Sequence, residues 1–160
     1  MTINTNLLRL TDCTIPTEWL DYNGHMNDAT YAIAFTHAVD AFMRHIGMDS
    51  NYRSTHKQTI FTLESHTRFL REVFVGEHLS TDLQLMDHDE KRAHVFMRLI
   101  DQSDVTRATS EQMLMVIDTN TRRAGRFCGL PADSLNALRV QQETLPIPAT
   151  FTRKMGIPKN

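Results

Sequence analysis

Residues 27–46, NDATYAIAFTHAVDAFMRHI, carry the pattern that decides the fold. Their large apolar side chains recur at spacings of three and four, which places them on one face of a helix. They are Tyr31, Phe35, Ala38, Phe42 and Ile46. Asn27 or Asp28 can cap the first turn, and Gly47 suits the position just past the last turn. The pattern predicts a helix over residues 27–45. Because further apolar residues widen this face, we expect it to be largely buried.

Downstream of this helix the apolar pattern changes to a period of two, which is typical of strands. A long strand is predicted over residues 61–70. Its expected faces are Phe61, Leu63, Ser65, Thr67 and Phe69 on one side and Thr62, Glu64, His66, Arg68 and Leu70 on the other. Further strands are predicted at residues 79–85, 95–99 and 106–117, and we expect Met113 and Met115 in the core. Short polar connections make these strands antiparallel neighbours.

The flanking segments complete the predicted order. A weak strand at residues 10–15 ends at Pro16, because proline cannot donate to a sheet ladder. Residues 49–57 form a polar connection, a short helix is expected at about 132–140, and the tail from Pro146 is expected to be loosely ordered. The fold class is therefore α+β, with one long helix buried against one curved antiparallel sheet. Free edges on so small a sheet favour pairing with a second copy.

The bulk properties exclude several classes of protein. A chain of 160 residues with no internal repeat suits a single domain. A net charge of −2 and a sequence pI of about 6.4 give no basic surface for nucleic acid or a membrane. No apolar run approaches the roughly 20 residues of a membrane span, and no signal peptide is recognised. Cys13 and Cys128 indicate reduced thiols in the cytoplasm, and the scattered histidines give no metal site.

A cluster of polar residues lies just ahead of the long helix. Five groups able to hydrogen-bond or transfer protons fall within eight residues: Asp21, Asn23, His25, Asn27 and Asp28. A helix N-terminus offers unpaired N–H donors that can stabilise an oxyanion on a carbonyl. A carboxylate beside it can attack a thioester or activate water. The bland alternative is an ordinary turn and cap, since Asn23-Gly24 is a strong hairpin signal.

A family resemblance favours the functional interpretation. Residues 18–27, EWLDYNGHMN, followed by Tyr31, resemble the signature before the central helix of hotdog-fold thioesterases, especially the 4-hydroxybenzoyl-CoA thioesterase group. The resemblance covers about residues 10–120 and implies a hotdog fold, in which the curved sheet wraps around the long central helix. We therefore expect residues 1–160 to be one hotdog domain, with the core at about 10–120 and the C-terminal helix and tail at 131–160. In that group an aspartate in this loop is the catalytic carboxylate, which implies this role for Asp21.

Four further stretches look like the thioesterases that accompany L-carnitine dehydrogenase in bacteria. They are residues 45–49 with Tyr52, residues 61–66, residues 89–94 and residues 109–113. This resemblance implies hydrolysis of betainyl-CoA to glycine betaine and CoA during L-carnitine degradation, with CoA as part of the substrate and no other cofactor. It also implies a homodimer or homotetramer, with an acyl pocket between helix and sheet shared between subunits.

These expectations assign roles to particular residues. Asp21 is the nucleophile or the general base, Asn23 and His25 orient it, and the backbone amides near Asn27 to Tyr31 polarise the carbonyl. A trimethylammonium group is bound by aromatic faces and carboxylates. The candidate substrate-binding residues are Trp19, Tyr22, Tyr31, Glu64 and Glu111. Trp19 can equally be a core anchor, and the two glutamates can equally lie on a solvated sheet face.

Three alternatives to betainyl-CoA hydrolysis remain open at this point. The acyl group can be another short or medium chain. An acyl-CoA hydratase or dehydratase would use a histidine with a carboxylate, for which His25 and Glu64 are candidates. A non-catalytic acyl-CoA-binding protein would show ligand binding without turnover.

Overall fold

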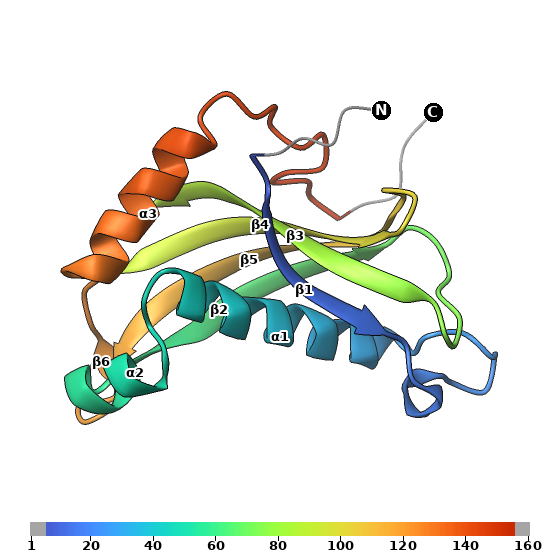
Figure 1. Ribbon diagram of the computed structural model, residues 1–160, viewed down its shortest axis with the longest axis horizontal. Coiled ribbons are helices and arrows are strands. Elements are labelled where there is room, and N and C mark those ends of the chain that lie inside the picture. The colour runs from blue at the N-terminus through green and yellow to red at the C-terminus, as the bar shows by residue number, and fades with distance from the viewer. Residues whose placement is uncertain (1–5, 156–160) are drawn as a thin grey trace.

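A computed structural model describes residues 6–155 as one curved antiparallel sheet with a long helix on one face (Figure 1). The strands are β1 (Leu8–Thr14), β2 (Gln58–Phe69), β3 (His78–His88), β4 (Arg92–Asp101), β5 (Thr106–Asp118) and the short β6 (Arg123–Ala124). The helices are α1 (Asp28–His45), α2 (Ser50–His56) and α3 (Leu130–Gln141), and a 3-10 turn spans Thr17–Trp19. The predicted α+β class is therefore confirmed.

The order of strands across the sheet is β1-β3-β4-β5-β2, with β6 beside β5. All pairs are antiparallel. Within the described part of the chain, this order leaves β2 at one edge, with β5 as its single neighbour. Figure 1 shows α1 against one face of the sheet, the inner face, while the chain after α3 runs over the other, outer face.

The core lies between α1 and the inner face of the sheet. The five predicted helix positions are all buried, with Phe35, Ala38, Phe42 and Ile46 at 0% exposure. Burying each of the two phenylalanines contributes about 1.5–3 kcal/mol. They pack in one cluster with Leu83 of β3 and Met97 of β4. Removal of this apolar stripe from water is what holds α1 in the curve of the sheet.

The ends of α1 follow the predicted signals. Asn27 is the N-cap, and its side-chain oxygen accepts the Ala29 N–H at 2.9 Å. At the other end Gly47 has a φ of +86°, which a residue with a side chain rarely adopts. A Cβ at Gly47 would also lie 2.5 Å from the Leu130 side chain at the start of α3. The helix therefore ends where the sequence indicates.

Strand β2 departs from the predicted alternation. Its register with β5 shifts between Thr62 and Glu64, which is a β-bulge. Phe61 is paired with Met115 and Phe69 with Ala108. Ala108 belongs to the core, so Phe69 faces inward, whereas Phe61 lies on the outer face. The prediction that Phe61 and Phe69 share a face is wrong because the bulge resets the period.

Other predicted segments also need correction. Met113 and Met115 are half-buried on the outer face, because the core-facing side chains of β5 are instead Ala108, Leu114 and Val116. Strand β1 begins at Leu8, earlier than expected. The expected polar connection contains α2, capped by the Asp49 side chain, which accepts the Tyr52 N–H at 2.8 Å. No residue of α2 is buried, so no apolar period marks it.

The C-terminal segment packs against the sheet, whereas the sequence predicted a loosely ordered tail. The Thr152 N–H donates to a Glu111 side-chain oxygen at 2.9 Å, and the Phe151 ring lies 4.9 Å from the His94 ring. Residues 146–155 thus contact the outer face of the sheet, while residues 156–160 of the predicted tail lie outside the described range. Of the helices in residues 6–155, none is long and apolar enough to cross a membrane.

Candidate active site

The loop that carries Asp21 is a tight turn closed by its own backbone. The Asp21 N–H donates to the His25 carbonyl at 3.0 Å, and the Gly24 N–H donates to the Asp21 carbonyl at 3.1 Å. Gly24 has a φ of +83°, and no atom lies within 4 Å of where its Cβ would be. Backbone conformation, not lack of space, therefore calls for glycine. The hairpin-turn alternative is correct as local structure, and this turn is what holds Asp21 in place.

The Asp21 side chain is only 15% exposed. Its Oδ1 accepts the Asn23 N–H at 2.8 Å, and its Oδ2 lies 3.5 Å from Asn23 Nδ2. His25 stands between two carboxylates, with Nδ1 3.8 Å from Asp21 Oδ2 and Nε2 3.9 Å from Glu72 Oε1. Both separations are longer than hydrogen bonds. Asn23 and His25 thus both lie against Asp21, as expected.

An open cavity of about 370 Å³ lies beside Asp21. Its lining residues come from the loop, the start of α1 and the end of β2: Asp21, His25, Met26, Asp28, Tyr31, Phe69, Leu70, Arg71 and Glu72. The Tyr31 ring meets the Phe69 ring edge to face, with centroids 5.0 Å apart. Burial raises the pKa of the Tyr31 phenol, an effect that Arg107 opposes and Glu77 and Glu72 reinforce. Tyr31 is therefore a neutral aromatic wall of the cavity at ordinary pH.

The amides at the start of α1 are less available than the sequence predicts. The Asn27 N–H donates to the Trp19 carbonyl, the Thr30 N–H to the Asn27 carbonyl, and the Ala29 N–H to the Asn27 and Asp28 side chains. Asp28 N–H makes no hydrogen bond within residues 6–155. Since Asp28 also lines the cavity, its amide is the candidate helix-end donor to a bound carbonyl.

Two of the predicted aromatic contacts do not line this cavity. Trp19 is half-buried against the core, and its ring centroid lies 6.5 Å from that of His37 on α1. This position fits the anchor alternative. Tyr22 is 97% exposed at the tip of the loop. Of the three aromatic candidates, only Tyr31 stands in the same cavity as Asp21.

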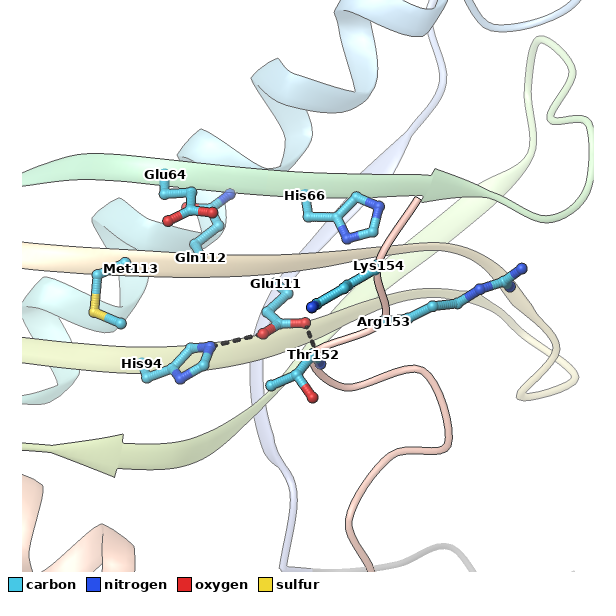
Figure 2. Close-up of a pocket in the computed structure, with 9 residues that line it drawn as sticks. All are labelled: Glu64, His66, His94, Glu111, Gln112, Met113, Thr152, Arg153 and Lys154. Atoms are coloured by element: carbon cyan, nitrogen blue, oxygen red, sulfur yellow. Dashed lines mark hydrogen bonds and ion pairs between the residues drawn. The ribbon is translucent and has the colours of Figure 1, made fainter. Parts of the chain in front are cut away.

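Glu64 and Glu111 lie on the outer face of the sheet, opposite α1. They line a separate pocket of about 380 Å³ with His66, His94 and the C-terminal segment (Figure 2). Glu111 Oε1 lies 2.8 Å from His94 Nε2, so Glu111 is a partnered side chain. The structure does not bring either glutamate to Asp21 within one chain. It also separates Glu64 from His25, the pair on which the hydratase alternative depends.

Four cavity residues, Phe69 to Glu72, were not identified from the sequence. They follow one another at the end of β2 and in the loop after it. The link is a long-range hydrogen bond, from the Met26 N–H to the Val73 carbonyl at 2.7 Å, which holds the two loops together. No local sequence pattern marks such a contact. In residues 6–155 no group of three or more His, Cys, Asp or Glu side chains is arranged to hold a metal ion.

Comparison with known proteins identifies the class. A family model described as the thioesterase-like superfamily matches residues 15–155. The chain belongs to this superfamily, and its fold and its relatives make it a hotdog-fold thioester hydrolase. The expected fold and enzyme class are thereby confirmed.

Individual relatives show more closely which proteins this chain is similar to. The chain is 40% identical over 142 residues to the betainyl-CoA thioesterase of Pseudomonas aeruginosa, covering 88% of this chain and 89% of that protein. It is 34% identical over 141 residues to the L-carnitine dehydrogenase/betainyl-CoA thioesterase of Agrobacterium fabrum, covering 88% of this chain and 29% of that longer protein. A hypothetical protein of Staphylococcus aureus, solved in complex with CoA, superposes with a TM-score of 0.87 at 32% identity, over 95% of this chain and 96% of that one.

Proposed function

We propose that the protein hydrolyses betainyl-CoA to glycine betaine and CoA. The observation that carries the proposal is the cavity itself, in which the Asp21 carboxylate stands beside an aromatic pair and the open amide of Asp28. The names of the relatives in Pseudomonas aeruginosa and Agrobacterium fabrum support the choice of acyl group. L-carnitine degradation in the cytoplasm remains the expected setting.

In the proposed reaction Asp21 acts as the nucleophile or as the general base. As a base it takes a proton from water, whose oxygen adds to the thioester carbonyl. As a nucleophile its own oxygen adds first, and water then releases the acyl group. In both routes the carbon–sulfur bond breaks and the thiolate of CoA leaves and takes a proton. The Asp28 N–H stabilises the oxyanion, which is typically worth about 3 kcal/mol for one such donor.

The remaining predicted residues take supporting roles in this proposal. Asn23 and His25 hold the Asp21 carboxylate, Asn27 caps α1, and Tyr31 packs against the acyl group. Trp19 anchors the loop to the core. Tyr22, exposed at the loop tip, is free to contact the CoA part of the substrate. Glu64 and Glu111 keep a role in cation binding only where a second copy brings them to the cavity.

A second copy is proposed to pair along the free edge of β2. This edge is 12 residues long and exposes apolar side chains, with Leu63 at 51% and Phe69 at 53% exposure. An unpaired apolar edge of this length favours association. Phe69 also lines the Asp21 cavity, so a partner on this edge would cover part of it. The choice between dimer and tetramer is a matter for measurement.

Thiol release from a panel of acyl-CoAs tests the proposal. The panel comprises betainyl-CoA, acetyl-CoA, butyryl-CoA, octanoyl-CoA and crotonyl-CoA, with released CoA detected by a colorimetric thiol reagent. The expected result is the highest kcat/KM for betainyl-CoA. A clear preference for an uncharged acyl chain would reject betainyl-CoA as the substrate. Consumption of crotonyl-CoA without free thiol would indicate hydration instead.

A further inference from the structure

The covalent geometry of the proposed substrate limits where its cation can lie. In a betainyl group one CH₂ separates the carbonyl carbon from the quaternary nitrogen. Standard bond lengths and angles then place the two atoms about 2.5 Å apart. If Asp21 acts on the carbonyl, the cation must enter the same cavity. Glu64 and Glu111, across the sheet, cannot serve it within one chain.

The Asp21 cavity has the charge that such a cation requires. Its lining holds three carboxylates, on Asp21, Asp28 and Glu72, against the single guanidinium of Arg71. Asp21 is needed at the carbonyl, and Asp28 is committed in part to capping, since its Oδ1 accepts the Ala29 N–H at 2.8 Å. Among residues 6–155, Glu72 is held by no ion pair except the distant one with His25 at 3.9 Å. Its carboxylate is therefore the one free to face a cation.

The aromatic walls suit a cation that has no N–H to donate. A quaternary ammonium is attracted to ring faces and to carboxylates, not to hydrogen-bond acceptors in particular. The rings of Tyr31 and Phe69 meet at an interplanar angle of 67°, so one ring presents its face where the other presents its edge. Tyr31 is buried in the core, whereas Phe69 is half-exposed at the cavity. Phe69 is thus the ring that is open to a ligand.

The loop after β2 holds Glu72 in a defined position. Arg107 of β5 donates through Nη1 to the Glu72 carbonyl at 2.6 Å and through Nη2 to Glu77 Oε2 at 2.7 Å. The next residue, Val73, accepts the Met26 N–H. On the other side the Arg71 N–H donates to the Arg107 carbonyl at 3.1 Å, so backbone bonds before and after Glu72 fix where its side chain begins. A carboxylate placed in this way can discriminate by charge.

We propose that Phe69 and Glu72 select a cationic acyl group, Phe69 through its ring face and Glu72 through its charge, in the cavity where Asp21 acts. This inference rests on the proposed thioesterase function and extends it to residues that determine specificity.

A pair of isosteric substrates tests the inference. Betainyl-CoA and 3,3-dimethylbutanoyl-CoA have nearly the same shape, because a carbon atom replaces the charged nitrogen. The measured quantity is the ratio of their kcat/KM values. In Glu72→Gln and in Phe69→Leu this ratio is expected to fall about 3- to 10-fold, the range of one exposed charge pair or cation–π contact.

Matched controls use residues that do not line the cavity. Glu143→Gln changes an exposed glutamate after α3, and Phe74→Leu changes a phenylalanine of similar exposure to Phe69. Both should keep the wild-type ratio. An unchanged ratio in Glu72→Gln and Phe69→Leu, or a wild-type enzyme that treats the two substrates alike, would overturn the inference while leaving thioester hydrolysis intact. Absence of thiol release from every acyl-CoA in the wild type would instead reject the proposed function.

Discussion

At the scale of single residues, the immediate neighbours of Asp21 set the position of its carboxylate. The turn that carries it is closed by Gly24 and His25, and the Asn23 N–H occupies one of its carboxylate oxygens. This leaves the other oxygen toward His25 and the cavity. The motif predicted from the sequence therefore forms a hairpin turn, and this turn holds the carboxylate that we propose to be catalytic.

At the scale of single residues, the burial of Tyr31 can be tested through the pH dependence of folding stability. Burial raises the pKa of its phenol in the folded state. Above pH 10, where an unfolded phenol ionises, the unfolded chain holds fewer protons than the folded one, so stability falls as pH rises. This contribution is intact below pH 10 and is lost as the pH passes through the folded pKa. Tyr31→Phe should therefore lose less stability between pH 9 and pH 11 than the wild type.

Urea unfolding followed by circular dichroism at the two pH values measures this difference. Tyr22→Phe, at the exposed loop tip, is the control and should follow the wild type. An equal fall in stability for Tyr31→Phe and wild type would contradict the burial of a protonated phenol at this position.

At the scale of elements, Arg107 is the residue that joins the sheet to the wall of the cavity. Its guanidinium donates to Asp101, to Glu77 and to the Glu72 carbonyl, and its own carbonyl accepts the N–H groups of Leu70 and Arg71. The loop after β2 is thereby held against β5. Because the same loop bonds to Met26, the position of the turn that carries Asp21 depends on it as well.

Replacement of Arg107 by Met should lower both stability and turnover. Loss of a guanidinium that is only 19% exposed leaves two carboxylates unpaired, at a cost of about 1–3 kcal/mol in the free energy of unfolding. We expect a fall in kcat larger than the rise in KM, because the loops that position Asp21 shift. Arg126→Met removes an exposed ion pair with Glu90 and should cost under about 1 kcal/mol with unchanged kinetics. Wild-type kinetics in Arg107→Met would show that the clamp does not position the site.

The helices and strands also show how much of the fold and of the candidate site can be predicted from the sequence. The spacing of Phe35, Ala38 and Phe42 predicts α1 correctly, because one apolar period persists over five turns. Strand β2 was predicted correctly, but its two faces were predicted wrongly, because the bulge between Thr62 and Glu64 leaves no local signal. Asp21 was found through a motif confined to one loop. Phe69 and Glu72 were missed because they reach the cavity only through tertiary contact.

At the scale of the whole molecule, the cavity lies where three separate segments meet. The turn after β1, the first turn of α1 and the loop after β2 converge there, and β2 continues from it as the free edge of the sheet (Figure 1). A partner on that edge would therefore contact the cavity and cover part of it. The proposed association and the proposed chemistry are linked through Phe69.

Leu63→Lys tests this association. Leu63 lies at the bulge of the free edge, and a lysine there places a charge against the partner strand. Light scattering coupled to size-exclusion chromatography should show an oligomer for the wild type and a smaller species for Leu63→Lys. Val140→Lys replaces an apolar residue of α3 that is 66% exposed and should leave the mass unchanged. A monomeric wild type, or an unchanged mass in Leu63→Lys, would contradict pairing through β2.

The central claim is that the Asp21 carboxylate carries out thioester hydrolysis. Its most direct test is thiol release from betainyl-CoA by the wild type and by Asp21→Asn, with circular dichroism and thermal unfolding to verify that the variant is folded. We expect a fall in kcat of at least about 100-fold, the lower range for loss of a general base. Near-normal release of CoA by a folded Asp21→Asn variant would contradict it.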